Sequence, residues 1–124
     1  MSAYSYTAEN GADLSAGRFK AVKYSSGSLV LCSAATDIPA GILQSNAPDT
    51  TTSGHDLKFI DAGPSKGSVG AAVTAGDFLT MDANGQLITS TATTDVICAK
   101  ARQDGDAQDD EIDILVCISP ARGT

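Results

Sequence analysis

An acidic segment near the C-terminus is the part of the sequence with the clearest capacity for metal chemistry. Residues 104–111 read DGDAQDDE and begin like a calcium-binding loop. An EF-hand loop needs Gly at its sixth position and Glu at its twelfth, where this chain has Asp109 and Leu115, and no helix pattern flanks the segment. We therefore expect a solvated hairpin loop. The alternative is a looser calcium site of carboxylate and carbonyl oxygens.

The single histidine is the next candidate for chemistry, because Ser53 and Asp56 lie close to His55 in the sequence. Residues this close along a chain seldom form a Ser-His-Asp triad, and the sequence has no G-x-S-x-G motif that would expose a nucleophile. The surrounding Thr, Ser and Gly residues indicate a loop. We expect a solvent-facing histidine and no catalytic residue.

Neither the cysteines nor a glycine-rich segment indicates a ligand site. Cys32, Cys98 and Cys117 lie far apart in the sequence, and each adjoins an apolar segment. Zinc sites use paired spacings such as C-x-x-C, so we interpret these cysteines as small buried hydrophobic side chains. Residues 63–70 lack the Walker pattern and are interpreted as a linker between two halves of the chain. The sequence thus predicts no metal and no cofactor.

Composition limits the class of protein and its partners. A chain of 124 residues favours one domain with one core. The formal net charge of −7 disfavours nucleic acid and anionic membrane surfaces as partners. The N-terminal segment lacks the basic and apolar parts of a signal peptide, and no apolar run approaches the length of a membrane span. We therefore expect synthesis in the cytosol and no transmembrane role.

Short apolar segments alternate with Gly, Ser, Asn, Asp and Pro throughout the chain, which is typical of a small β-sandwich or β-barrel. Turn residues support hairpins at 24–28 and at 81–86, where Asn84 and Gly85 tolerate positive φ. The polar stretches 46–54 and 103–110 are predicted to be exposed loops. The predicted strands are residues 19–24, 29–32, 41–44, 57–60, 78–81, 86–89, 97–101 and 112–118.

The order of these segments recurs within the chain. Residues 14–19, LSAGRF, match residues 73–78, VTAGDF, and this match aligns Phe19 with Phe78. We predict two repeated halves of about four strands each, residues 13–67 and 68–124, that close on one shared core. The alternative is a likeness that arises from composition alone. The later segments that match in the same order are 27–29 with 85–87, 37–41 with 95–99, and 56–60 with 111–115.

The repeated elements resemble those of small capsid decoration, or cement, proteins of tailed bacteriophages. The motifs LSAGRF and VTAGDF carry the resemblance, and each is followed by a strand, a glycine turn, a second strand and a segment that reads DIPAGIL or DVICAKA. The resemblance implies a compact β-barrel that is made in the host cytoplasm and forms a homotrimer on the outer surface of the capsid. There it would clamp neighbouring major capsid proteins together.

The same resemblance implies an extended N-terminal arm, here residues 1–12, that grips the shell. Tyr4 and Tyr6 are the residues of this arm that we expect to contact the capsid, because tyrosine offers both ring area and a hydroxyl group. A frayed terminus is the alternative.

The last predicted strand carries apolar residues on both faces. A strand with one solvent-exposed face would carry polar residues at Leu115 and Cys117. These two side chains are therefore predicted to lie either in the core of the monomer or at a subunit interface. The residues of one face are Ile112, Ile114, Val116 and Ile118, and those of the other are Asp113, Leu115 and Cys117.

Together these features favour a structural virion protein that is not an enzyme and that stabilises the head. One alternative is a fibre or tail module that binds a host receptor or a carbohydrate, which the absence of Trp disfavours. A small hydrolase or lyase is the other alternative, and the lack of a catalytic motif disfavours it.

We predict that the isolated protein gives no stoichiometric binding isotherm with Ca²⁺ or Zn²⁺, because neither the acidic segment nor His55 has the partners that a metal site requires. Calorimetric titration measures this directly. Micromolar binding of one ion per chain would contradict the prediction, and an Asp106→Asn variant would then show whether the acidic segment supplies the ligands.

Overall fold

The computed structural model describes residues 4–9, 17–25, 28–44 and 56–119, and at 4–9, 56–57 and 119 it describes the backbone alone. These residues form strands and no helix, so no described helix is long and apolar enough to cross a membrane. The all-β fold class predicted from the sequence is thereby confirmed. The strands are β1 (Tyr4–Glu9), β2 (Ala21–Ser25), β3 (Ser28–Leu31), β4 (Gly41–Leu43), β5 (Asp56–Ser68), β6 (Phe78–Met81), β7 (Leu87–Thr89), β8 (Ile97–Ala101) and β9 (Glu111–Ser119).

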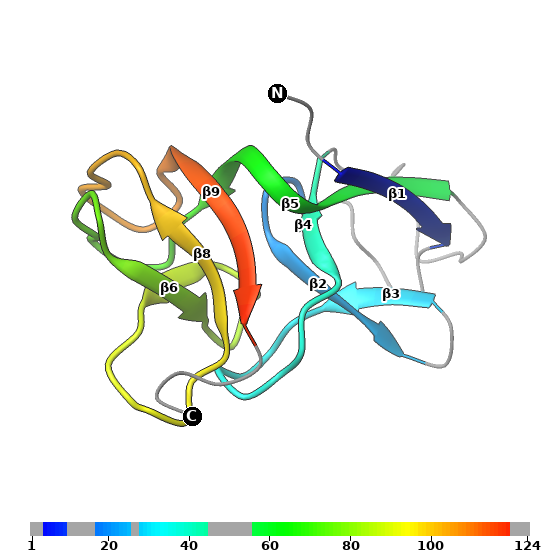
Figure 1. The fold of residues 1–124 in the computed structure, drawn as a ribbon, viewed down its shortest axis with the longest axis horizontal. Coiled ribbons are helices and arrows are strands. Elements are labelled where there is room, and N and C mark those ends of the chain that lie inside the picture. Colours follow the sequence, from blue (N-terminus) through cyan, green and yellow to red (C-terminus); the bar gives the residue numbers. More distant parts are fainter. Residues whose placement is uncertain (1–3, 10–16, 26–27, 45–55, 120–124) are drawn as a thin grey trace.

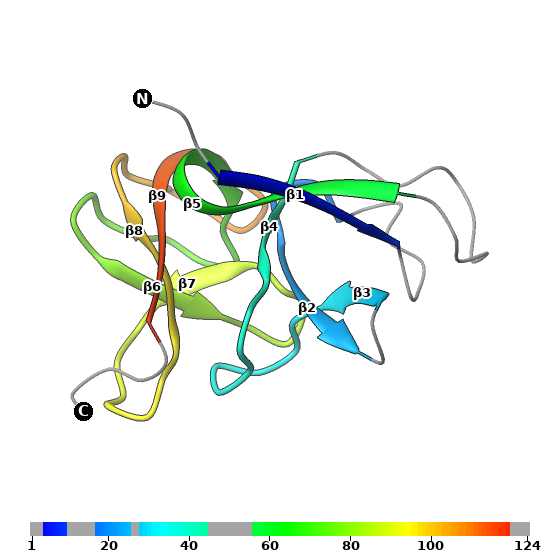
Figure 2. The ribbon, with the colours of Figure 1, turned by 45° about the vertical axis from the view of Figure 1, so that its right-hand side comes forward.

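One antiparallel sheet contains all of the described strands. Its order is β3-β2-β4-β5-β9-β8-β6-β7, and β1 pairs with β5 outside this path. The long strand β5 joins the two sides, because its first part pairs with β1 and β4 and its second part pairs with β9. The sheet curls at β5, so that β6, β8 and β9 lie on one side of the molecule and β1 to β4 on the other (Figures 1 and 2).

The structure corrects the prediction for the glycine-rich residues 63–70. They are not a linker, because residues 62–68 pair with β9 from Ala62 opposite Cys117 to Ser68 opposite Glu111. Gly63 has a φ of 105°, which residues with a side chain seldom adopt, and it lies where β5 passes from one set of partner strands to the other.

All eight predicted strands are present, and β1 is an additional strand.

Two hydrophobic clusters pack against the curled sheet. Alternation along the strands divides them: Ala21 and Ile42 belong to the larger cluster, whereas Val22 and Leu43 belong to the smaller one. Strand β4 and the start of β2 are therefore buried on both faces. The smaller cluster, which we call the side core, consists of Val22, Leu29, Leu43 and Phe59. The larger cluster, which we call the shared core, consists of Ala21, Cys32, Ile42, Val69, Val73, Leu79, Met81, Leu87, Val96, Cys98, Ala99, Ala101, Ile112, Ile114 and Val116.

Strands β2 to β5 pair in the same order as β6 to β9. The N–H of Phe19 donates to the carbonyl oxygen of Leu43 at 2.7 Å, and the N–H of Gly76 donates to that of Ala101 at 2.7 Å. Phe19 and Gly76 also both have positive φ, at 63° and 96°. The structural counterpart of Phe19 is therefore Gly76, and the sequence alignment of Phe19 with Phe78 is wrong. That the halves superpose and arose by duplication stays a prediction.

A turn closed by an aspartate occurs at corresponding places on the two sides. Oδ2 of Asp37 accepts hydrogen bonds from the N–H groups of the residues four and three positions before it, at 2.8 and 3.1 Å. Oδ2 of Asp95 does the same at 3.1 and 3.1 Å. The bond from Ser33 holds the pKa of the Asp37 carboxyl below its ordinary value, and the Lys23 ammonium, 3.0 Å away, acts in the same direction.

We predict that Gly76→Ala lowers the free energy of unfolding by about 1 kcal/mol, because an L side chain is strained at positive φ. A Cβ at this position would meet no atom within 4 Å, so only the backbone conformation opposes the substitution. Gly76→Asn should cost less, since Asn tolerates positive φ. Urea denaturation measures both variants, and equal stability of the Ala variant and the wild type would contradict the prediction.

Candidate assembly interface

The face of the sheet that points away from the shared core carries a line of directly paired residues. Phe78 of β6 lies opposite Lys100 of β8. Lys100 lies opposite Leu115 of β9, and Leu115 lies opposite Pro64 of β5. Directly paired residues of an antiparallel sheet project to the same face. We call these four residues the outer row.

The outer row is largely apolar and only partly covered. Phe78 is 46% exposed, Pro64 is exposed, and Leu115 is half-buried. On the opposite face of β9, by contrast, Ile114 is 1% exposed. Cys117, which pairs with Ala62 next to the outer row, is also half-buried. The described residues of the monomer therefore cover Leu115 and Cys117 incompletely, and their role at a subunit interface stays a prediction.

Lys100 is the only charged residue of the outer row. Its Nζ lies 5.9 Å from the centroid of the Phe78 ring, within the range of a cation–π interaction. Burial raises the pKa of the Cys117 thiol, and the positive charge of Lys100 partly offsets that effect. The Lys100 ammonium thus interacts with the Phe78 ring on β6 and lowers the pKa of the Cys117 thiol on β9.

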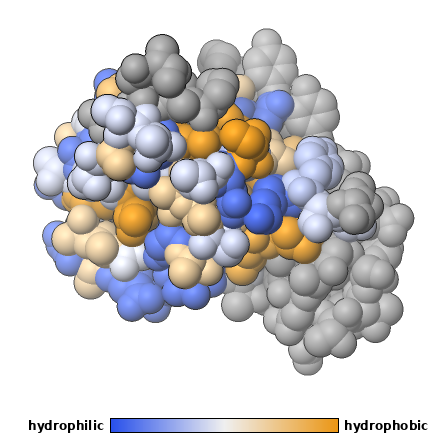
Figure 3. Space-filling view, turned by 90° about the horizontal axis from the view of Figure 1, so that it is seen from below, coloured by the Kyte–Doolittle hydropathy of each residue, from blue (hydrophilic) through white to orange (hydrophobic). Residues whose placement is uncertain are grey.

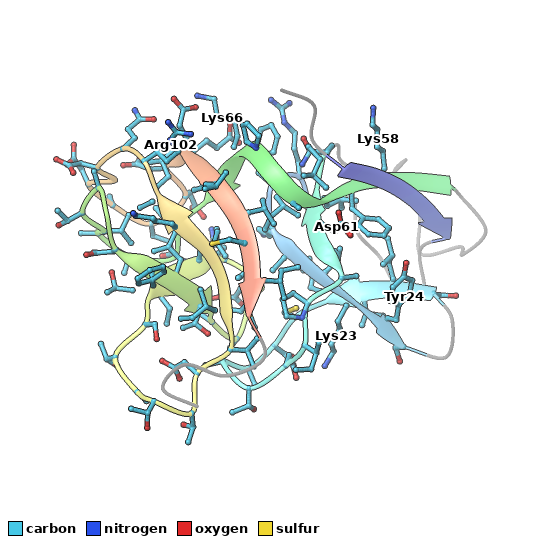
Figure 4. The ribbon with its side chains drawn as sticks, in the orientation of Figure 1. Lys23, Tyr24, Lys58, Asp61, Lys66 and Arg102 are labelled. Carbon is cyan, nitrogen blue, oxygen red and sulfur yellow. The ribbon has the colours of Figure 1, made fainter. Side chains whose placement is uncertain are left out.

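A charged margin borders the outer row. Nζ of Lys66 lies 2.7 Å from Oδ1 of Asp113, and both side chains are exposed, so this ion pair contributes little to stability. The N–H of Arg102 donates to the carbonyl oxygen of Asp113 at 2.9 Å. An open pocket of about 330 Å³ lies here, lined by Pro64, Ser65, Arg102, Asp113 and Ile114. Lys66 and Arg102 lie near one another at this margin (Figure 4).

Exposed apolar residues also occur away from the outer row. Tyr24 is 55% exposed and Ile38 is 61% exposed. The Tyr24 ring packs edge-on against Phe59 with 6.1 Å between centroids. Seen from below, hydrophobic residues reach the surface in separate patches among hydrophilic ones (Figure 3). The outer row is therefore distinguished by its alignment across four strands rather than by exposure alone.

The residues predicted to contact the capsid lie on another part of the sheet. Tyr4 and Tyr6 belong to β1, where they pair with Ala62 and Phe59 of β5. Residues 4–9 of the predicted arm are thus part of the sheet instead of extending away from the domain. The side chains of β1 lie outside the described residues, as do His55 and the predicted loop 46–54. The contact role of the two tyrosines stays a prediction.

The acidic segment forms a loop that is held by hydrogen bonds. Oδ2 of Asp110 accepts the N–H groups of Asp106 and Ala107 at 2.8 and 3.1 Å. Gln86, which is 2% exposed, donates from Nε2 to Oδ1 of Asp109 at 2.6 Å. Within the described ranges, no group of three His, Cys, Asp or Glu side chains is placed to hold a metal ion.

The cysteines differ in burial. Cys32 and Cys98 are fully buried, as the sequence predicts, whereas Cys117 is half-buried. Burial raises the pKa of the Cys32 thiol to about 12, and the nearby Asp37 carboxylate acts in the same direction. Burial also raises the pKa of Cys98 far above its ordinary value. We therefore expect Cys117 to be the most reactive of the three thiols.

Comparison with solved structures finds a bacteriophage protein with a similar fold. The chain is similar to the N base of the head fibre protein gp8.5 of bacteriophage phi29, with a TM-score of 0.69 and 14% sequence identity over 99% of each chain. At this identity the likeness shows the fold alone. No protein-family model matches the sequence, and a search of curated proteins finds no match.

We predict that in the native monomer, at protein concentrations too low for self-association, one thiol, that of Cys117, reacts with a chromogenic disulfide reagent, and that all three react after unfolding. The thiolate is the reactive species and burial raises its pKa, so the native reaction should be slow at neutral pH and still accelerate above pH ~9. Cys117→Ala should abolish the native reaction. Two thiols that react at the same rate in the native protein would contradict the assignment.

Proposed function

We propose that this protein is a structural component of a tailed-phage head that binds the outer capsid surface and cements neighbouring major capsid proteins. The observation that carries the proposal is the likeness of the fold, over 99% of both chains, to the N base of the phi29 head fibre protein. The likeness supports a protein associated with the phage head. The sequence resemblance to capsid decoration proteins supports the finer role of a cement.

In the proposed mechanism, the protein stabilises the shell through the contact area that it buries against capsid subunits, and no catalytic step is involved. A homotrimer would engage neighbouring capsid subunits at once, so that binding of one copy raises the effective concentration of the other two at their sites. Weak individual contacts then combine into tight attachment. A protein that binds the assembled shell and not its separated subunits stabilises the shell by mass action. The proposal assigns no reaction and no cofactor to the chain.

Strand β1 is the proposed contact with the major capsid protein. Among the described strands, β1 pairs with β5 alone. Its other edge offers backbone hydrogen-bonding groups to a partner. Tyr4 and Tyr6 belong to this strand, and tyrosine is a residue type that can offer both ring area and a hydroxyl group to a partner.

The same structural likeness favours a second candidate, the base of a fibre. The phi29 protein is the N base of a head fibre. By this second candidate, our chain would stay attached to the head and carry another part that binds a host receptor or a carbohydrate. The two candidates differ in their effect on the shell. A cement raises the resistance of the shell to rupture, whereas a fibre base needs only to stay attached.

We predict that saturating amounts of the protein raise the temperature at which purified heads release DNA. Dye fluorescence during heating measures release, and quantification of bound protein measures its ratio to the major capsid protein. A Tyr4→Ser/Tyr6→Ser variant that keeps the wild-type unfolding midpoint is the control and should bind more weakly. Heads that rupture at the same temperature with and without saturating bound protein would contradict the cementing role and favour the fibre base.

A further inference from the structure

The outer row corresponds to a row that is buried on the other side of the molecule. The carbonyl oxygen of Ala21 accepts the N–H of Cys32 at 3.0 Å. In the same arrangement, the carbonyl oxygen of Phe78 accepts the N–H of Ser90 at 2.8 Å. Ala21 and Phe78 therefore occupy equivalent positions at the start of β2 and β6.

The strands beside them extend this correspondence. Ala21 pairs with Ile42, and Ile42 pairs with Ile60, in the same order in which Phe78, Lys100 and Leu115 pair in the outer row. Ala21 and Ile42 are fully buried in the shared core, and Ile60 packs against it. A row at this position is thus covered by a second layer of the sheet in one half of the chain and is exposed in the other.

Charge also distinguishes the outer row and its margin from the rest of the chain. The chain has 15 acidic and 8 basic residues. This face reverses the balance, with Lys66, Lys100 and Arg102 against the carboxylates of Asp113 and of Glu111, which lies two positions before Asp113 on β9. Asp113 is paired with Lys66, which leaves Lys100 and Arg102 without an ion pair in the part of the chain that the structure describes.

We propose that the outer row and its charged margin bind a second copy of this chain. Phe78 and Leu115 supply the apolar contact, and Lys100 and Arg102 face carboxylates of the neighbouring copy. A second copy fits this face because its net charge of −7 is opposite in sign to the face, and its acidic segment exposes Asp104 and Asp106.

The arrangement of charge also sets the symmetry of the contact. A positive face that meets a negative segment elsewhere on the neighbour is a head-to-tail contact, and such contacts generate closed rings when the rotation closes. The inference therefore rests on the proposed homotrimer and gives it a binding surface.

Sedimentation velocity over a series of protein concentrations tests the inference. Lys100→Glu should weaken self-association at least about ten-fold, because it places like charges at the contact. Lys58→Glu is the matched control: it makes the same change in charge at an exposed position of β5 that lies away from Lys66 and Arg102, and it should leave association unchanged (Figure 4). Phe78→Ser should also weaken association, and high salt should weaken that of the wild type.

Each variant is first compared with the wild type by urea denaturation, because an exposed residue such as Lys100 should not change the unfolding midpoint. Equal self-association of Lys100→Glu and Lys58→Glu, or a wild type that stays monomeric at every concentration, would overturn the inference. A Lys100→Glu protein that self-associates normally but no longer binds heads would assign the row to the shell instead. Self-association that depends on Lys100, in a protein that binds no heads, would support this inference while contradicting the proposed function.

Discussion

The packing of two layers of one curled sheet on the shared core is the interaction on which the rest of the structure depends. Ala21 and Ile42 from one side of the sheet belong to the same buried cluster as Ile112 and Ile114 from the other. Burial of an isoleucine side chain contributes about 1.5–3 kcal/mol to stability. One half of so short a chain has too little apolar surface to form such a core alone. Strand β5 holds the layers together, because it pairs with strands of both.

This arrangement leaves the two layers unequally covered. Strand β4 and the first two residues of β2 lie between the shared core and the side core, so both faces are apolar there. Strands β8 and β9 contribute one face to the shared core and present Lys100 and Leu115 on the other. The outer row is thus exposed because only one face of β8 and β9 packs against the shared core, and no described strand covers the other face. The positive charge at that line, on a chain with a net charge of −7, makes the face suited to an acidic protein surface.

The likeness to a phage head fibre base is a likeness of fold, at 14% sequence identity. Two chains can share an all-β fold when turns and buried positions agree, while their surfaces differ in almost every residue. Function therefore has to be argued from the surface that this chain presents. Here that surface is a paired row across four strands with a charged margin, and contact between copies of this chain is the role that we propose for it.

Sequence patterns by themselves determined where most strands lie and which side chains are buried. Alternation at residues 112–118 assigns Ile112, Ile114 and Val116 to a core, and glycine turns separate the hairpins, because these features depend on neighbours along the chain. Tertiary structure alone decided that residues 63–68 form a strand, since their Gly and Pro content hides a pairing with the distant strand β9. It also decided that Phe19 corresponds to Gly76, because both take a positive φ set by hydrogen bonds to other strands. Periodicity shows that a strand has two apolar faces, but the layer that covers each face is fixed by contacts between segments far apart in sequence.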